Sequence, residues 1–277
     1  MVRLAILGAL SSHADAFCRF ASERDDVELV GVFGEDLLRT AYLCETFGIE
    51  RKSPAELADQ CDVAAILFRS GDKHLKYAEP FIRKRIPVFI DKPFTKTTGD
   101  AAALIDLLRS YDCPFLGGSC VKLSDEILYL RKKIAAEPVL HSGYCAFPVQ
   151  FNSTSDGFHF YSHHLIETML HLFGLGVRSV IAKRSGHLLS AIAAYDTFHV
   201  VMNFAVQDGQ YVAGYFGESN FELVPFNIET AGKRQFEELI CFAKDKKIVY
   251  SAEFFMETVK ISTALELSMV QNTEIFL

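Results

Sequence analysis

The sequence predicts an α/β protein, in which a doubly wound parallel sheet is followed by an α+β region with a mostly antiparallel sheet. Two observations lead to this fold class. Over the first 120 residues, short and nearly continuous apolar runs alternate with amphipathic stretches, as in parallel strands covered by helices on both faces. Beyond residue 120, strands with alternating apolar and polar residues take over. We therefore expect two domains, at residues 1–120 and 121–277.

The elements of the first region follow in order. Short apolar runs with the pattern of buried strands occupy residues 2–7, 27–33, 63–68, 88–90 and 115–117. Helical spacing of apolar residues occurs at 13–24, 37–47, 75–85 and 99–110. A further helix is predicted to begin at Ser53, which caps it, with Pro54 in the first turn and Glu56 reaching back to the cap.

The second region has a different rhythm. Helices are predicted at 124–135, around the histidine-rich segment 159–167, and at 236–244 and 252–268. Strands are predicted at 139–149, 200–206 and 211–216. The Asp208-Gly209 pair lies between the last two strands and is typical of a two-residue hairpin turn.

Composition limits the classes of function. The 277 residues are 50% hydrophobic, which is enough for a sizeable core, and the net charge is −7 with no basic run among aromatics. We therefore expect no nucleic-acid partner. The apolar start contains Arg3 and is too short for a signal peptide, and no apolar run reaches the roughly 18 residues of a membrane helix. Seven cysteines without a C-x-x-C pair indicate reduced thiols, so we expect a cytoplasmic protein.

The segment after the first strand carries part of a dinucleotide-binding signature. In a Rossmann-type unit this strand leads into G-x-G-x-x-G, which brings phosphate groups against a helix N-terminus. Residues 8–13 read G-A-L-S-S-H, so only Gly8 is in place. The hydroxyls of Ser11 and Ser12 and the imidazole of His13 could donate to phosphate oxygens instead. Ser12 could equally be no more than the helix cap.

The acid after the second strand bears on the choice of cofactor. Glu35 is one position later than the residue that usually binds a ribose hydroxyl. A carboxylate there would repel a 2′-phosphate, which favours NAD slightly over NADP, although Arg39 keeps NADP open.

Two segments contain side chains suited to chemistry. Residues 87–95, PVFIDKPFT, take a strand directly into Asp91-Lys92-Pro93, so Lys92 would stand at the C-terminal edge where open α/β sheets bind ligands. Some seventy residues later, HFYSHHLIE at 159–167 brings imidazoles, a phenol and a carboxylate together. A lysine and a histidine together suit hydride chemistry on an alcohol.

Gly8, the Asp-Lys-Pro segment and the histidine helix that ends in Phe173-Gly174 resemble the glucose-fructose oxidoreductase/inositol dehydrogenase (Gfo/Idh/MocA) family. In that family E/D-K-P ends a Rossmann strand, and D-x-x-x-H-x-x-D opens a helix of the substrate domain. The sequence matches the second motif at His164 and Glu167, with Phe160 in the place of the first aspartate. His74 stands where the family often has a histidine. The residues assigned to the cofactor site are Gly8, Ser11, Ser12, His13, Glu35, Ser70, His74, Asp91, Lys92 and Pro93.

The resemblance implies an NAD(P)-dependent oxidoreductase acting on a secondary alcohol of a sugar, polyol or related molecule, assembled as a homodimer or homotetramer through its antiparallel sheet. Lys92 would lie beside the nicotinamide and stabilise the developing alkoxide, and His164 would accept the hydroxyl proton. Because Phe160 cannot orient His164, a proton relay would use His163, His159, Tyr161 or water.

Two other classes of function stay open from the sequence. The imidazoles of His159, His163 and His164 with the carboxylate of Glu167 could face one metal ion, although H-E-x-x-H is absent. Alternatively, the incomplete glycine loop and Phe160 could mark a catalytically silent sensor that binds a nucleotide or sugar.

Overall fold

The computed structural model describes residues 1–151, 153–205 and 210–277. The described chain divides into two compact units, Met1–Gly118 with Gly232–Ala252, and Ser119–Ala231 with Glu253–Leu277. The chain thus changes unit near the predicted boundary at residue 120, but the segment Gly232–Ala252 returns to the first unit. The sequence pattern did not indicate this return. The predicted domain limits themselves stay a prediction.

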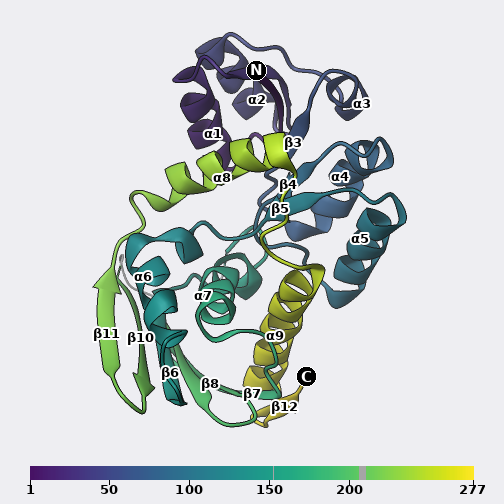
Figure 1. Cartoon of the computed structure of the whole chain (residues 1–277). Helices are drawn as coiled ribbons and strands as arrows, with labels where there is room; N and C mark the ends of the chain where they lie inside the picture. Colours follow the sequence, from purple (N-terminus) through teal and green to yellow (C-terminus); the bar gives the residue numbers. More distant parts are fainter. Residues whose placement is uncertain (152, 206–209) are drawn as a thin grey trace. The chain divides into compact units, whose positions relative to one another are not determined.

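The first unit is a parallel sheet with the strand order β2-β1-β3-β4-β5 over its described residues. The strands are β1 (Val2–Leu7), β2 (Val27–Phe33), β3 (Val63–Ile66), β4 (Val88–Ile90) and β5 (Phe115–Gly117). The helices are α1 (Ser12–Ser22), α2 (Leu37–Phe47), α3 (Pro54–Ala58), η1 (Gly71–Lys73), α4 (His74–Arg83), α5 (Thr98–Ser110) and α8 (Ala231–Asp245). Helices cover both faces of the sheet (Figure 1), so strands such as β3 and β4 are buried throughout.

Local sequence explains the ends of several helices. Ser53 and Glu56 form the predicted capping box, in which the Ser53 hydroxyl accepts from the Glu56 N–H and the Glu56 carboxylate accepts from the Ser53 N–H. Helix α1 is capped by Ser11, whose side chain accepts from the His13 N–H, so the alternative that Ser12 is the cap was wrong. Ser12 is instead the first helical residue and is exposed.

Helix α8 completes one face of the first unit. The ring of Phe17, on α1, lies 5.6 Å from that of Phe89 and 5.4 Å from that of Phe236 on α8. The side-chain amide of Gln235 donates to the Gly118 carbonyl at 2.8 Å. These contacts explain why Gly232–Ala252 belongs to this unit, because Phe236 packs against the aromatic ring of Phe17 and Gln235 binds the end of β5.

The second unit is built on a sheet with the order β11-β10-β6-β9-β8-β7-β12 over its described residues. Its strands are β6 (Leu140–Pro148), β7 (Ser179–Ser185), β8 (Leu188–Ala194), β9 (His199–Ala205), β10 (Tyr211–Gly217), β11 (Phe221–Phe226) and β12 (Ile275–Phe276). Its helices are η2 (Val121–Leu123), α6 (Asp125–Ile134), α7 (Phe158–Phe173) and α9 (Ala252–Gln271). Helices α6, α7 and α9 lie on one face of the sheet (Figure 1). Together the two sheets confirm the predicted fold class.

The pairing in this sheet corrects one prediction. The turn residues Asp208-Gly209 and the predicted strand end Val206 lie outside the described residues. The two strands that flank them, β9 and β10, do not pair with each other, because β6 lies between them and pairs with both. The β6–β9 pair is parallel, while the other strand pairs among the described residues of this sheet are antiparallel. A strong local turn signal therefore did not decide which strands became neighbours.

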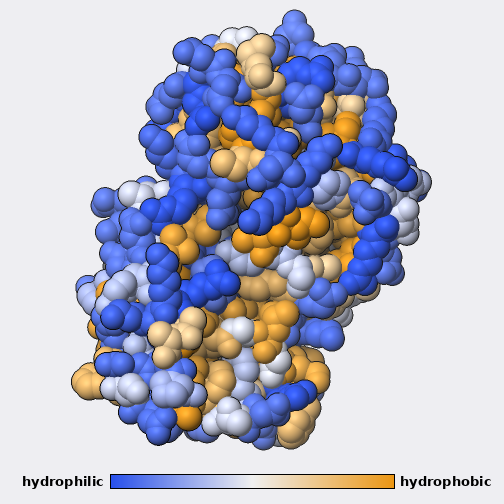
Figure 2. Space-filling view, in the orientation of Figure 1, coloured by the Kyte–Doolittle hydropathy of each residue, from blue (hydrophilic) through white to orange (hydrophobic). Residues whose placement is uncertain are grey.

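The face of this sheet without helices carries an apolar row. The cross-strand register places Ile181, Ile192, Val201, Tyr144, Gly214 and Leu223 side by side on six neighbouring strands. Ile181, Ile192 and Leu223 are exposed, at 44%, 40% and 55%. On the side where α6, α7 and α9 lie toward the viewer, hydrophobic residues also reach the surface of the second unit among hydrophilic ones (Figure 2).

Candidate functional site

The residues predicted for a cofactor in the first unit gather at the carboxyl ends of adjacent strands. Gly8 follows β1, Ser70 follows β3 by four residues, and Asp91-Lys92-Pro93 follows β4. Gly8 has φ +107°, and a Cβ there would lie 2.5 Å from the Phe68 backbone nitrogen. The first glycine of the signature is therefore required both by its backbone conformation and by the close approach of the segment after β3.

The first turn of α1 is joined to the end of β4 by the contact between His13 and Asp91. Nδ1 of His13 lies 2.9 Å from Oδ2 of Asp91, whose other oxygen accepts from the Lys92 N–H at 2.8 Å. Burial would raise the pKa of Asp91, but the charges of His13 and Lys92 hold this pKa below its usual value. Asp91 is thus a buried carboxylate that fixes His13, a contact that the sequence did not predict.

Glu35 stands two residues beyond β2 and is held by two side chains. Its carboxylate accepts from the Tyr77 hydroxyl at 2.6 Å and is paired with the Lys73 ammonium. The hydrogen bonds from Lys73 and then from Tyr77 hold the pKa of Glu35 below its usual value. Arg39, which kept NADP open, is paired with Asp15. A negative charge therefore stands at the end of β2.

His74 and Lys92 are both buried, but in different ways. The ring nitrogens of His74 lie 3.0 Å from the Phe94 carbonyl and 2.8 Å from the Phe68 carbonyl, and the side chain is fully buried. His74 therefore ties together the segments after β3 and β4, and its assignment to the cofactor site stays a prediction. Lys92 is 5% exposed and is followed by Pro93 through a cis peptide bond.

In the second unit, the histidine helix α7 presents His164 on a buried polar cluster. Nδ1 of His164 lies 2.6 Å from the hydroxyl oxygen of Ser119, and the ring is partly exposed. Oε2 of Glu167 accepts from Nζ of Lys122 and from the Ser119 N–H, each at 2.7 Å. Lys122 and Glu167 are 1% and 0% exposed, so this is a fully buried ion pair. We call Ser119, Lys122, His164 and Glu167 the His164 cluster.

The other members of the predicted relay have different surroundings. His163 is fully buried, so a substrate could not touch its ring without a change in structure. Nε2 of His159 lies 3.0 Å from Oε2 of Glu266, and Nδ1 lies 2.7 Å from the Ser262 hydroxyl. Phe160, at the position of the missing aspartate, is buried with its ring 4.8 Å from that of Tyr161. The structure thus assigns His159 to a contact between α7 and α9.

Sequence reasoning missed Ser119 as the neighbour of His164 and Lys122 as the partner of Glu167. Ser119 follows Gly117-Gly118 after β5, and no motif marked it. The sequence signal for Lys122 was weak, because a lysine in C-V-K-L is unremarkable until its burial is known. Glu167, by contrast, was singled out by the helix motif.

The side chains of the alternative metal site do not assemble. Across the described residues, no three His, Cys, Asp or Glu side chains are placed so that they could hold a metal ion. The carboxylate of Glu167 binds Lys122 and Ser119, and His159 binds Glu266 and Ser262. These partners explain why the histidine-rich spacing does not make a metal centre.

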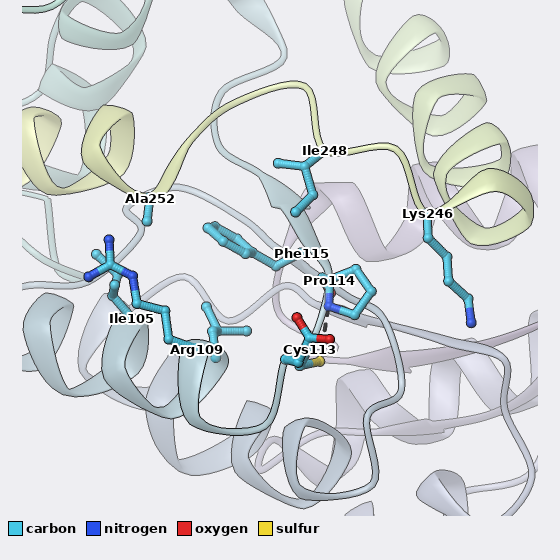
Figure 3. Close-up of a pocket in the computed structure, with 10 residues that line it drawn as sticks. Ile105, Arg109, Cys113, Pro114, Phe115, Lys246, Ile248 and Ala252 are labelled. Atoms are coloured by element: carbon cyan, nitrogen blue, oxygen red, sulfur yellow. Dashed lines mark hydrogen bonds between the residues drawn. The ribbon is translucent and has the colours of Figure 1, made fainter.

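A pocket in the first unit lies away from the predicted cofactor residues (Figure 3). It is lined by Ile105, Leu108, Arg109, Asp112, Cys113, Pro114, Phe115, Lys246, Ile248 and Ala252. Phe115 begins β5, so the pocket is at the amino end of this strand, whereas Gly8, Ser70 and Lys92 follow the carboxyl ends of theirs. Ligands of open α/β sheets bind at the carboxyl ends, so this pocket is not the predicted site.

Comparison with known families identifies the first unit. Residues 2–118 match the model described as oxidoreductase family, NAD-binding Rossmann fold, of the Gfo/Idh/MocA group. Residues 2–118 belong to the Gfo/Idh/MocA family. The resemblance stated from Gly8 and Asp91-Lys92-Pro93 is thereby confirmed, and the family description includes an NAD-binding Rossmann fold. No curated protein sequence matches the chain.

Solved structures match the whole length of the chain at low sequence identity. GenD2 from gentamicin A biosynthesis, in complex with NAD, has a TM-score of 0.87 at 14% identity, over 100% of this chain and 96% of that one. Scyllo-inositol dehydrogenase from Lactobacillus casei, with bound NAD(H) and scyllo-inositol, has a TM-score of 0.88 at 12% identity, over 100% and 99%. A putative myo-inositol dehydrogenase from Sinorhizobium meliloti 1021 has a TM-score of 0.84 at 14% identity, over 100% and 99%. These likenesses extend the shared fold to both units.

In residues 1–151, 153–205 and 210–277, no helix has both the length and the apolar character needed to cross a membrane.

Proposed function

We propose that this protein is an NAD(P)-dependent oxidoreductase that transfers hydride between a nicotinamide and a secondary alcohol of a sugar, a polyol or a related small molecule. The observation that carries the proposal is the family match of residues 2–118, within which Lys92 stands directly after β4. The sugar or polyol substrate is supported by the inositol dehydrogenases among the structures of the same fold.

The residues of the first unit fit a nicotinamide dinucleotide. The chain passes Gly8 with a backbone that only glycine adopts easily and enters α1, whose N-terminal N–H groups favour anionic phosphate. Ser11, Ser12 and His13 stand at this helix start, and Ser70, Asp91 and Pro93 follow the neighbouring strands. The ionised Glu35 suits ribose hydroxyls and would repel a 2′-phosphate, so we propose NAD before NADP.

The chemistry assigned to this chain is the handling of charge and of one proton. A bound nicotinamide supplies hydride transfer. Lys92 would stabilise the negative charge that develops on the substrate oxygen as its proton leaves. His164 would accept that proton at Nε2 in the tautomer whose own proton is on Nδ1, the nitrogen that is directed to Ser119. His163 would support this role from within α7, since its buried ring cannot contact the substrate.

The test is a spectrophotometric assay of NAD⁺ and NADP⁺ reduction across a panel of sugars and polyols, with the affinity for each nucleotide measured by calorimetry. We expect Lys92→Ala and His164→Ala each to lower kcat by about 100-fold or more, the usual scale for positioned acid/base groups. The exposed residues Lys132 and His187 offer matched controls, and Lys132→Ala and His187→Ala should leave kcat unchanged. Wild-type turnover in both site variants would contradict the assignment. Clear nucleotide binding without turnover of any substrate would favour a silent sensor.

We further propose that the protein is a homodimer or homotetramer in which a second copy covers the apolar row on the open sheet face. A two-fold axis through this face would place the row of one copy against the same row of the second copy, so each row would cover the exposed apolar side chains of the other. Ile192 lies within the row, and Ile192→Lys should shift the sedimentation coefficient toward that of the monomer. The exposed Leu38, on α2 of the first unit, offers the control, since Leu38→Lys should leave assembly intact. A monomeric parent protein would remove this proposal.

A further inference from the structure

The contact between Ser119 and His164 answers a question raised by Phe160. A histidine that moves a proton needs a partner on its second nitrogen to hold the ring in place, and Phe160 cannot provide one. The hydroxyl oxygen of Ser119 lies 2.6 Å from Nδ1 of His164. Ser119 is 45 residues away in sequence, in the segment that leaves β5 and enters η2.

The hydrogen bonds of the Ser119 hydroxyl indicate which way its proton points. The hydroxyl oxygen already accepts from the Val121 N–H at 3.1 Å. Among the described residues, Nδ1 of His164 is the acceptor within hydrogen-bond distance of its own proton. The tautomer that gives this buried proton an acceptor is therefore the one in which Ser119 donates to Nδ1 and the neutral imidazole carries its own proton on Nε2.

The position of Ser119 is fixed by the same helix that carries His164. The Ser119 N–H donates to Oε2 of Glu167, which lies three residues after His164 on α7. Lys122, three residues after Ser119, donates to the same oxygen from Nζ. Because the ion pair is fully buried and Ser119 is itself 0% exposed, the hydroxyl is held in one place relative to the imidazole.

We propose that Ser119 is the positioning residue of His164 and replaces the carboxylate that Phe160 does not supply. The inference rests on the proposed role of His164 as the acid/base group. A carboxylate on Nδ1 can only accept a hydrogen bond, whereas a hydroxyl can donate or accept. Ser119 can thus hold the ring in either neutral tautomer.

This freedom has a consequence for the proton step. Before an alcohol can donate into Nε2, the neutral ring must change tautomer: the Nε2 proton is given up to solvent and Nδ1 takes up a proton. The Nδ1–H then donates a hydrogen bond to the lone pair of the Ser119 oxygen that Val121 does not use. As hydride leaves the substrate carbon, the alcohol proton moves to Nε2 and gives an imidazolium and a carbonyl. The imidazolium then donates to a neutral oxygen and not to a carboxylate, so it is stabilised less and returns its proton more readily.

The experiment measures the tautomer of His164 directly. In ¹⁵N-histidine-labelled protein without ligand, we expect Nδ1 of His164 to give a pyridine-type signal and Nε2 a pyrrole-type signal. His164→Gln, which removes both signals, assigns them. In Ser119→Ala the two tautomers should mix, and Ser119→Thr, which keeps the hydroxyl, should restore the single tautomer. Ser119→Asp should raise the midpoint of the His164 titration.

The matching kinetic readout is a fall in kcat of about ten-fold in Ser119→Ala, the value of one hydrogen bond, with KM little changed. Thermal unfolding shows whether each variant folds, and if Ser119→Thr does not, the spectrum of Ser119→Ala decides alone. An unchanged single tautomer in Ser119→Ala would overturn the proposal. If the parent protein turns over no substrate while its His164 signals respond to Ser119 as expected, the proposed function fails and the Ser119 contact stands.

Discussion

Helix α7 carries two polar clusters, and in each a serine hydroxyl meets Nδ1 of a histidine. At His159 the serine is Ser262, and Glu266 takes Nε2, so both ring nitrogens are used by side chains of α9. At His164 the serine is Ser119, and the ring keeps a partly exposed edge. The same serine–histidine pair is thus a structural contact in one place and suits proton transfer in the other.

The two clusters also differ in the burial of their charges. Glu266 is half exposed, at 53%, while Glu167 is fully buried and faces the buried ammonium of Lys122. An exposed ion pair contributes little to stability, but a buried charge that loses its partner is strongly destabilising. The comparison indicates that the position of His164 depends on the buried Lys122–Glu167 ion pair, whose loss would strongly destabilise the protein. The position of His159 does not depend on a buried ion pair, since Glu266 is half exposed.

The largest expected effect comes from removing the carboxylate of the His164 cluster. In Glu167→Ala, the buried ammonium of Lys122 would lose the carboxylate that lies 2.7 Å away, and the Ser119 N–H would lose its acceptor. We expect the free energy of unfolding to fall by about 3–5 kcal/mol in urea titrations. Glu266→Ala, the matched control on the His159 side, should cost less than about 1 kcal/mol.

A second variant separates charge from packing. The double variant Lys122→Met, Glu167→Leu replaces the ion pair with apolar side chains of similar size and should recover most of the lost stability. The kcat of the double variant should stay below that of the parent protein, because the Ser119 N–H would have lost the Glu167 carboxylate that holds it. If Glu167→Ala and Glu266→Ala lowered the free energy of unfolding by the same amount, the proposed difference between the two clusters would be wrong.

A smaller effect is expected from His171, farther along α7. Burial, and then the cations of Arg131 and Lys122, lower the pKa of His171 from 6.5 to about 3. The unfolded chain therefore binds a proton between pH 6.5 and 3 that the folded chain does not, so this group destabilises the fold as the pH falls through that range.

Between pH 7 and pH 4.5 this histidine should lower the free energy of unfolding by about 2–3 kcal/mol, since one pKa unit corresponds to about 1.4 kcal/mol. Urea unfolding at the two pH values measures the loss, which should be smaller by that amount in His171→Leu. The exposed His187 gives the control, since His187→Leu should leave the pH dependence unchanged. An unaltered acid sensitivity in His171→Leu would show that other groups set it.

Much of the first unit could be predicted from local pattern. The predicted limits of β1, β2, β4, β5 and α2 agree with the structure, because short apolar runs between polar turns leave little choice of register. The capping box at Ser53 was equally readable, since its hydrogen bonds span three residues.

What the sequence could not predict depends on contacts between distant residues. The parallel pairing of β6 with β9 overrides the Asp208-Gly209 signal, because the sheet order is set by packing across the whole unit. Ser119 reaches His164 across 45 positions, and Lys122 reaches Glu167 in the same way. The residues of the candidate site were largely named from motifs, but the partners that orient them were not.

The return of α8 to the first unit has a consequence for synthesis on the ribosome. Phe236 lies against Phe17 and Phe20, so a chain that has grown only to residue 118 still lacks the helix that covers this aromatic cluster. The amino-terminal unit can therefore be completed only after residue 252 has emerged, when nearly all of the other unit has been translated. The unit that begins first on the ribosome must therefore wait for 113 residues of the other unit, 119–231, before its own last segment is made.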